Sequence, residues 1–558
     1  MQLEGHRSQT IADSPSPKTL VLSGSHLDLD VFDRAVQGQV DLKLSNASSV
    51  VERVQQANQL VQQAVKNREA VYGVTTGFGG MANEAVPGEL ADQLQCNLLN
   101  FLSAGVGEPI DARHVRGAML ARANMLLRGH SGIRLELIER MISFLNANAV
   151  PLVREHGSIG ASGDLVPLAA IARAITGQGH KVKVEIEGES LDSAEALSRL
   201  GYSTVDLQAK EGLALVNGSS FSAAIAANSL IESRKQFCLA MGIQAIFLRT
   251  LLAHEQPFES FVHECKPHPG QLWVARTIHR MLTVGADTIE DKNHPVQDRY
   301  SIRCLPQYFG PIAEGLGRLQ KMVETEINGV SDNPLVDPEA GCLVQSGNFL
   351  GQAIGMGMDE LRRHIALTAK HLDIQIAMIV APEFNGGLNA SLKGNIDNPV
   401  NMGLKGLQIA GNSIAPMLMQ KSSPLVEHFP TYAEQFNQNI NGLSWGSANL
   451  AWESTQLFSD YLSISLLFAV QAADLRSHQV FGHYDGRKLL GTLLEPLYQK
   501  VFEIIGESPS AKLPLLFNDT DRCLEKDIEK LSHAIRGSEF AEFLHPVLQS
   551  FESELGNG

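Results

Sequence analysis

Two long stretches in the second half of the chain most constrain its fold. Residues 351–380 continue for about thirty positions without a proline, roughly 45 Å at the helical rise per residue, and residues 443–481 continue for longer still. Helices of this length with so little charge leave apolar surface that one chain cannot cover by itself. We therefore expect a bundle of long helices whose apolar faces meet other subunits.

Shorter patterns define the rest of a mainly α fold. Helical spacing of apolar residues predicts helices at 27–36, 50–65, 89–102, 116–127, 135–146, 165–175, 223–252 and 309–329. Residues 19–22 are a short strand candidate, and the alternation of Val182, Val184 and Ile186 with charged residues predicts a small hairpin. We divide the chain into a disordered leader (1–18), an N-terminal domain (19–205), a central domain of long helices (206–500) and a C-terminal helical segment (501–558).

Charge and cysteine usage limit the function classes. The net charge of −16 argues against nucleic acid or an anionic membrane as partner, because both attract clustered Lys and Arg. The six cysteines are scattered without a CxxC pair, which is typical of free thiols in a reducing cytosol. The leader lacks an apolar signal-peptide core, and we find no run of about 18 uncharged apolar residues. We expect a cytoplasmic protein.

The segment Gly157 to Leu168 is the most unusual chemically. It is too rich in glycine and serine for a helix, so it must be a loop held at both ends. Within Ala161-Ser162-Gly163, the Gly163 nitrogen can attack the Ala161 carbonyl carbon and close a five-membered ring. Loss of water from that ring and from the Ser162 side chain then leaves an electrophilic methylidene group. The alternative for so short a pattern is a flexible glycine-serine connection.

The longer string, G-S-I-G-A-S-G-D-L-x-P-L-A, resembles the signature of the aromatic amino acid and histidine ammonia-lyases. In that family this Ala-Ser-Gly becomes the prosthetic group 4-methylideneimidazol-5-one (MIO). The resemblance covers residues from about 72 to 484 and implies a homotetramer with each active site built from three chains. The length of 558 residues leaves no room for the C-terminal insertion of the plant enzymes, so a compact, bacterial-type phenylalanine ammonia-lyase is the member that the chain most resembles.

A second glycine-rich loop, residues 72–82, allows two interpretations. Gly77 to Ala82 fits the loose dinucleotide pattern G-x-G-x-x-A, which also needs a preceding strand and a helix that begins inside the motif. The family has a matching Tyr-Gly-Val-Thr-Thr-Gly-Phe-Gly, and its tyrosine implies that Tyr72 is the catalytic base. A base that acts near neutral pH needs a lowered pKa. An ordinary hydrogen-bonded loop tyrosine is the structural alternative.

A third segment offers a carboxylate clamp. Gln297, Tyr300 and Arg303 step by three, so a helical turn or two would present them on a common face. An arginine can hold a carboxylate through two parallel hydrogen bonds. A surface helix with an exposed arginine explains the same spacing. The resemblance implies that Arg303 holds the substrate carboxylate and that Tyr300 lies beside the electrophile.

Several further polar residues match the family. Asn217 and Asn348 each lie among small residues, and both could be ordinary turns. The resemblance implies that they line the prosthetic group and hydrogen-bond it or the substrate, which would polarise the ring carbonyl. Glu434 and Gln438 are four apart, on one face if the segment is helical. With Lys405 they resemble the family's polar site residues, and Glu434 suits the substrate ammonium. A structural Glu–Lys ion pair is the competing interpretation.

Phe101 and Leu102 occupy the position that decides substrate choice in the family. An apolar pair there leaves a phenolic hydroxyl without a partner, which penalises tyrosine and favours phenylalanine. Metals are not expected: His263 and His268 are five apart with Pro267 between them, so hydrogen-bonding histidines are the better interpretation.

Together these features predict an enzyme that converts L-phenylalanine to trans-cinnamate and ammonia with MIO as its only cofactor. The electrophile would activate the substrate by bonding either its amine or its ring. The alternatives are an aromatic 2,3-aminomutase that gives β-phenylalanine, a tyrosine or histidine ammonia-lyase, an inactive helical scaffold, and a dehydrogenase built on residues 77–82.

Overall fold

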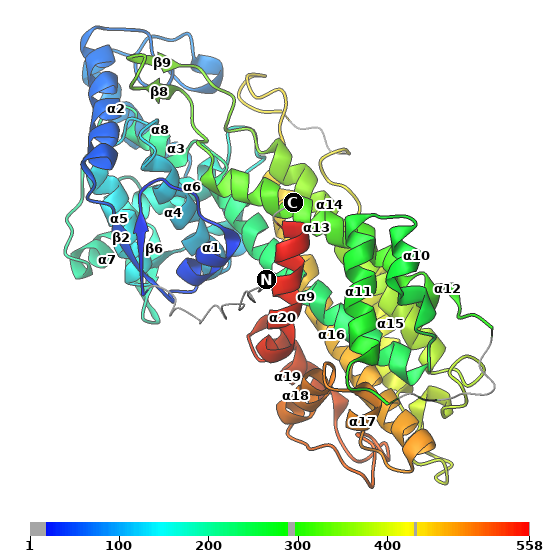
Figure 1. Ribbon diagram of the computed structural model, residues 1–558. Helices are drawn as coiled ribbons and strands as arrows, with labels where there is room; N and C mark the ends of the chain where they lie inside the picture. Colours follow the sequence, from blue (N-terminus) through cyan, green and yellow to red (C-terminus); the bar gives the residue numbers. More distant parts are fainter. Residues whose placement is uncertain (1–17, 288, 290–295, 429–431, 557–558) are drawn as a thin grey trace, which may run out of the picture.

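A computed structural model describes residues 18–287, 289, 296–428 and 432–556. The predicted leader at 1–18 therefore lies, except for Lys18, outside the described residues. The fold is mainly α, as predicted: a smaller N-terminal part packs against a bundle of long helices, and the C-terminal helices cover one end of the bundle (Figure 1).

Among the described residues, the N-terminal part combines short helices with three small sheets, and a fourth sheet comes from the second half of the chain. β1 pairs in parallel with β2, β3 pairs with β5, and β4, β6 and β7 form an antiparallel sheet. The elements are β1 (Thr19–Leu22), α1 (Leu29–Val36), β2 (Asp41–Leu44), α2 (Ser48–Lys66), α3 (Ala91–Phe101), β3 (Val106–Pro109), α4 (Ala112–Leu126), α5 (Leu135–Asn146), β4 (Val150–Pro151), β5 (Arg154–His156), α6 (Leu165–Thr176), β6 (Lys183–Ile186), β7 (Glu189–Asp192), α7 (Ser193–Arg199) and α8 (Glu211–Val216). The predicted hairpin is β6–β7, in which Val184 and Ile186 are buried.

Long helices dominate the remainder of the chain. The elements are α9 (Ser220–Thr250), α10 (Ser260–Glu264), α11 (Pro269–Thr283), α12 (Tyr300–Arg303), α13 (Leu305–Asn328), β8 (Leu335–Asp337), β9 (Cys342–Val344), α14 (Gln352–Ile379), α15 (Lys405–Lys421), α16 (Ser444–Phe481), α17 (Arg487–Leu490), α18 (Glu495–Ile505), α19 (Leu524–Arg536) and α20 (Ala541–Phe551). α14 and α16 confirm the two long helices expected from the sequence. Almost every residue of α9 is buried, because this helix has no continuous polar face and lies among α4, α13, α14 and α16.

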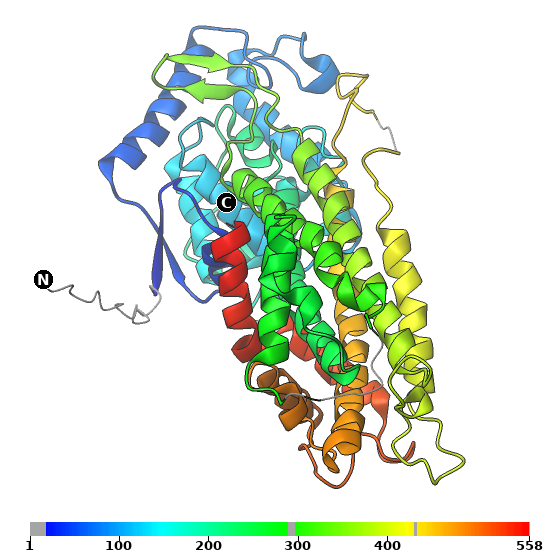
Figure 2. The same cartoon turned by 45° about the vertical axis from the view of Figure 1, so that its right-hand side comes forward.

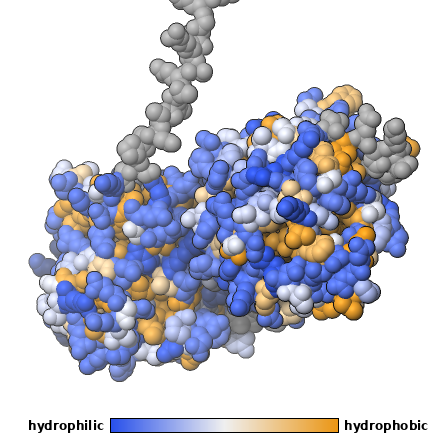
Figure 3. All heavy atoms as spheres, turned by 90° about the horizontal axis from the view of Figure 1, so that it is seen from below, coloured by the Kyte–Doolittle hydropathy of each residue, from blue (hydrophilic) through white to orange (hydrophobic). Residues whose placement is uncertain are grey.

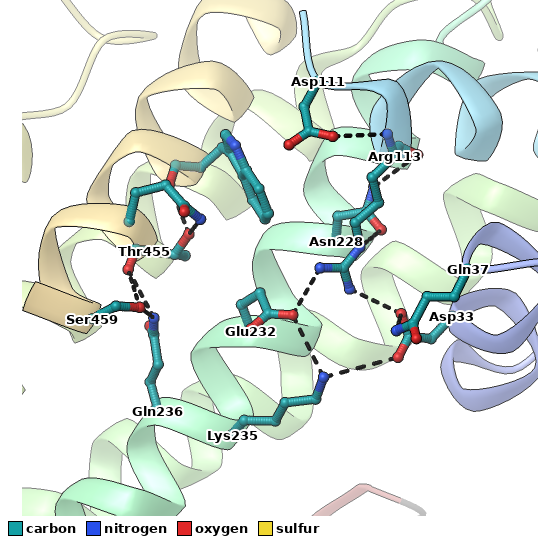
Figure 4. Close-up of polar contacts among 12 residues, drawn as sticks. Asp33, Gln37, Asp111, Arg113, Asn228, Glu232, Lys235, Gln236, Thr455 and Ser459 are labelled. Carbon is teal, nitrogen blue, oxygen red and sulfur yellow. Dashed lines mark hydrogen bonds and ion pairs between the residues drawn. The ribbon is translucent and has the colours of Figure 1, made fainter. Parts of the chain in front are cut away.

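Partly buried ion pairs of Arg113 join the N-terminal part to the bundle (Figure 4). The Arg113 guanidinium of α4 contacts Asp33 of α1 at 2.9 Å and Glu232 of α9 at 2.8 Å. Further along α9, the Gln236 amide donates to the Thr455 carbonyl of α16 at 2.8 Å. Because a buried charge is costly unless it is paired, these contacts fix how α9 sits between its neighbours. α9 begins three residues after Asn217, so its placement also places the candidate site.

The large core is continuous. One cluster of buried apolar side chains extends from Leu22 to Phe551, so the domain boundaries at 205 and 500 stay predictions. All six cysteines are free thiols, as expected. Among the described residues no helix is long and apolar enough to cross a membrane.

Apolar side chains also remain on the surface. On the face seen from below they are interspersed with hydrophilic residues (Figure 3). α15 packs on α14 and α16 and lies at the outer edge of the bundle (Figure 2). Ile409 of α15 is 71% exposed, and Val400, just before this helix, is also 71% exposed.

Candidate active site

A cavity of about 470 Å³ lies where the N-terminal part meets the loops at one end of the bundle. Its walls come from six segments of the chain, which are 72–82, 98–101, 161–165, 213–217, 333–350 and 434–440. Of the candidate residues, seven line it: Tyr72, Phe101, Ala161, Ser162, Asn217, Glu434 and Gln438.

The Ala161-Ser162-Gly163 segment is a loop between β5 and α6, held at both ends as predicted. The carbonyl of Gly160 accepts a hydrogen bond from the Gly351 amide at 3.1 Å. Gly163 has a φ of 70°, and a Cβ added there would lie 2.0 Å from the carbonyl carbon of Gly218. Only glycine fits this left-handed position against a neighbouring backbone.

Two side chains donate hydrogen bonds to the central serine, Ser162. The Asn217 Nδ2 donates to the Ser162 carbonyl oxygen at 3.0 Å, and the Gln438 Nε2 donates to the Ser162 hydroxyl at 2.9 Å. The Asn217 contact reaches the Ser162 carbonyl, and the polarising role expected for this asparagine stays a prediction. Just beyond the tripeptide, burial raises the pKa of Asp164 to about 6. Its carboxylate accepts from the Ser222 amide at 2.7 Å and the Ser158 hydroxyl at 3.0 Å.

Tyr72 lines the cavity with its phenol oxygen held by the loop that follows it. The Gly79 amide donates to this oxygen at 2.9 Å. Burial nevertheless raises the pKa of Tyr72, and the negative charge of Glu434 adds to the increase. The expected lowering of this pKa is therefore wrong for the contacts within one chain, because desolvation outweighs the single amide donor.

The buried side chain of Gln95 fixes the Tyr72 loop. Its amide donates to the Gly73 carbonyl at 2.9 Å, and its oxygen accepts from the Leu213 amide at 2.9 Å. The sequence analysis missed this residue, since a glutamine inside an amphipathic helix carries no motif.

An apolar wall forms one side of the cavity. The Phe78 and Phe101 rings lie 6.3 Å apart at a tilt of 57°. The apolar side chains beside them are Leu98, Leu165 and Leu213. Leu102 is only 6% exposed and does not line the cavity, so its predicted place in the pocket is wrong. α3 presents Leu98 and Phe101 to the cavity, three residues apart on one helical face, and turns Leu102 toward the core.

Residues 434–438 do not form the predicted helix. Ala433 and Gln438 pair as an antiparallel bridge, and Glu434, Gln435 and Phe436 have φ values of 54°, 49° and 68° in the turn between them. Glycines across the cavity make room for this turn. A Cβ on Gly79 would lie 2.2 Å from the Glu434 carboxylate. Glu434 and Gln438 still line the same cavity, but through a tight turn and not through helical spacing.

Four other candidate residues are not among those that line this cavity in the single chain: Gln297, Tyr300, Arg303 and Lys405. Asn348 is not a lining residue either, although its neighbours Gly347 and Phe349 are. α12 contains only Tyr300 to Arg303, so the prediction that Gln297 shares its helical face is wrong. The Arg303 guanidinium lies over the Tyr300 ring, 4.7 Å from its centroid. Tyr300 is 72% exposed, and Lys405 is exposed at the first turn of α15.

The cavity of one chain therefore lacks a cation. No lysine or arginine is among the described residues that line it, although Glu434 supplies a carboxylate. A substrate carboxylate would need a positive partner from elsewhere.

Two alternatives from the sequence can be assessed. Gly79–Met81 is a short 3₁₀ turn with no strand among the described residues directly before it, so the dinucleotide-binding interpretation is wrong. His263 hydrogen-bonds through both ring nitrogens, to the Pro257 carbonyl at 2.9 Å and the Gln271 amide at 3.0 Å, as expected of a structural histidine. Within the described part of the chain, no three His, Cys, Asp or Glu side chains could hold a metal ion.

Comparison with known proteins shows which family the chain belongs to. Residues 27–501 match the family model described as aromatic amino acid lyase. The chain is 45% identical over 540 residues to a phenylalanine ammonia-lyase of Nostoc punctiforme, with 95% of each chain covered. It is 39% identical to an aromatic ammonia-lyase of Loktanella atrilutea, covering 96% of this chain and 99% of the relative. Among solved structures, the phenylalanine aminomutase of Pantoea agglomerans matches with a TM-score of 0.84 at 29% identity, covering 94% of this chain and 99% of that one. The chain belongs to the aromatic amino acid lyase family and is an enzyme.

Proposed function

We propose that this enzyme eliminates ammonia from L-phenylalanine to give trans-cinnamate, with MIO formed from Ala161-Ser162-Gly163. The observation that carries the proposal is the hydrogen bond from Asn217 Nδ2 to the Ser162 carbonyl oxygen, inside a cavity with an apolar wall. The 45% identity to a phenylalanine ammonia-lyase supports the same substrate.

The residues around the tripeptide fit the prosthetic group. Gly163 approaches the Gly218 backbone more closely than any side chain would permit, which favours a compact loop. Asn217 is placed to donate to the carbonyl that the ring would retain, and Gln438 contacts the hydroxyl that would leave as water. Once formed, the group supplies an electrophile that no ordinary side chain offers.

The chain's own residues then have separate tasks. Phe78, Leu98 and Phe101 hold the phenyl ring, and Glu434 holds the ammonium group. Tyr72 takes the β-hydrogen as a proton; the electron pair left behind forms the double bond as the C–N bond breaks and ammonia leaves with its pair. The raised pKa of Tyr72 in one chain means that a cation must come close before the phenol can act as a base near neutral pH.

We further propose that the cation comes from another subunit of a homotetramer. Arg303, Lys405 and Tyr300 lie outside the cavity of their own chain, whereas the cavity has a carboxylate and no cation. In this arrangement Arg303 would hold the substrate carboxylate, with Gln297 and Asn348 as further polar contacts. The exposed apolar side chains near α15 would be covered in the assembly. Free cysteines favour a cytosolic location.

A phenylalanine aminomutase is the second candidate. The structural match to the Pantoea agglomerans enzyme favours it, although the identity is lower at 29%. Incubation with L-phenylalanine followed by chromatographic separation of cinnamate and β-phenylalanine decides between the two. We expect cinnamate, absent in Ser162→Ala; mainly β-phenylalanine would refute the lyase assignment. Turnover of tyrosine or histidine ahead of phenylalanine would refute the substrate.

A further inference from the structure

Arg122 lies beneath the Ala-Ser-Gly loop and is 1% exposed. Its guanidinium, on α4, donates to three backbone carbonyls, two from the end of α8 and one from the loop after α13. These are Ala214 at 2.5 Å, Asn217 at 2.7 Å and Ser331 at 3.0 Å. A planar guanidinium can serve several acceptors in fixed directions at once, which a lysine ammonium on a flexible stem cannot reproduce.

These carbonyls belong to the backbone that supports the tripeptide. The residue whose carbonyl Arg122 holds, Asn217, sends its side chain to the Ser162 carbonyl oxygen. The next residue, Gly218, pairs with Gly163 as a parallel bridge, and its carbonyl accepts from the Asp164 amide at 2.8 Å. Arg122 thus holds the backbone of Asn217, whose side chain makes one contact with the loop, and the adjacent Gly218 makes the other.

The packing around Gly218 leaves no room for a side chain at this position. Gly218 has a φ of 148°, and an added Cβ would lie 2.2 Å from the Ser331 carbonyl oxygen and 2.4 Å from the Arg122 Nη1. The guanidinium therefore holds the Asn217–Gly218 turn between itself and the tripeptide. Removal of Arg122 would leave three buried carbonyls without their donor and free the turn to move away from Gly163.

The buried charge of Arg122 has compensating neighbours. Burial lowers the pKa of Arg122 to about 10, while the negative charges of Asp332 and Asp164 oppose that change. Asp332 is itself paired with Lys210 at 2.8 Å, and both side chains are completely buried. The guanidinium therefore stays protonated near neutral pH and keeps all its donors.

We propose that Arg122 is a positioning residue for formation of the prosthetic group, acting through the Asn217–Gly218 turn; this rests on the proposed function. In the step it supports, the Gly163 nitrogen bonds to the Ala161 carbonyl carbon. The Ala161 oxygen leaves as water with the hydrogens of the Gly163 and Ser162 nitrogens, and the Ser162 hydroxyl leaves as water with the Ser162 α-hydrogen. No oxidant is needed. Arg122 keeps Gly163 close and directs the Asn217 amide at the Ser162 carbonyl.

The test compares Arg122→Lys and Arg122→Gln with Arg116→Lys. Arg116 is the matched control, because it is a buried arginine on the same helix that also donates to backbone carbonyls, those of Val36 and Leu145 at 2.6 and 2.9 Å. Each full-length protein is produced in a short pulse of expression, and samples taken at intervals afterwards are followed by intact-mass spectrometry for loss of two waters. Circular dichroism and thermal unfolding confirm that each variant is folded.

We expect folded Arg122 variants to lose the waters roughly tenfold more slowly than Arg116→Lys, the scale of one lost charged hydrogen bond. The fully dehydrated fraction should also show a lower kcat with little change in KM, because Asn217 is misaligned. Dehydration at the Arg116→Lys rate in a folded Arg122 variant would overturn the inference.

Two further outcomes separate the inference from the function on which it rests. If the unsubstituted protein is active but loses no water, the proposed function fails. If both Arg122 variants fail to fold, Asn217→Ala tests the same route: this folded variant should dehydrate slowly, and dehydration at the full rate would overturn the proposed route through the turn.

Discussion

The hydrogen bond from Asn217 to the Ser162 carbonyl leads to the most specific prediction. Asn217→Ala removes one donor aimed at the carbonyl conjugated with the proposed electrophile. The donor distance is 3.0 Å and Asn217 is 4% exposed, so bulk water has little access to replace the amide. The Arg122 contact goes to the Asn217 backbone and survives the substitution.

The magnitude follows from comparable sites. Removing one preorganised donor from a desolvated oxyanion site costs about 10²- to 10³-fold in kcat, or roughly 3–4 kcal/mol. We expect a decrease of this size in kcat, with KM changed by less than about threefold because Asn217 acts on the electrophile and not on the ring pocket.

The assay is cinnamate absorbance, with each rate divided by the dehydrated fraction from intact mass. Asn437→Ala is the matched control, because Asn437 lines the same cavity and leaves the Asn217 contact in place. A fully dehydrated Asn217→Ala enzyme whose kcat stays within about threefold of the unsubstituted enzyme would refute the reasoning.

Three other predictions concern different parts of the site. Glu434→Gln removes a charge that raises the pKa of Tyr72, so the acid limb of the kcat/KM profile, where Tyr72 must lose its proton, should move to lower pH; a limb that stays in place would count against Tyr72 as the base. Lys210→Met leaves Asp332 buried without its partner and should cost about 3–5 kcal/mol in urea unfolding; a loss below about 1 kcal/mol would contradict this. Phe101→His offers a phenolic hydroxyl a partner and should raise kcat/KM for tyrosine relative to phenylalanine roughly tenfold; an unchanged ratio would remove Phe101 from substrate choice.

The long helices were predictable because their cause is local. α14 and α16 end within one residue of the predicted bounds, since apolar residues without proline continue to the flanking glycines and turns. The loop that contains Ala161-Ser162-Gly163 was equally predictable, because its density of glycine and serine excludes a helix.

The candidate site was only partly predictable, because its geometry depends on distant segments. The spacing of Glu434 and Gln438 predicts a common helical face. The segment instead forms a tight turn, for which Gly79 and Gly80 leave room. The pKa of Tyr72 depends on burial by residues remote in the sequence. Arg122 carries no motif: a buried arginine cannot be told from a surface one in the sequence alone.

The formation of an electrophile from the backbone is the central claim, and the intact mass of the purified, active protein tests it most directly. The proposed function predicts a mass two waters below that of the sequence, with the loss located at residues 161–163 and absent in Ser162→Ala. Full sequence mass in protein that still converts L-phenylalanine to cinnamate would contradict it.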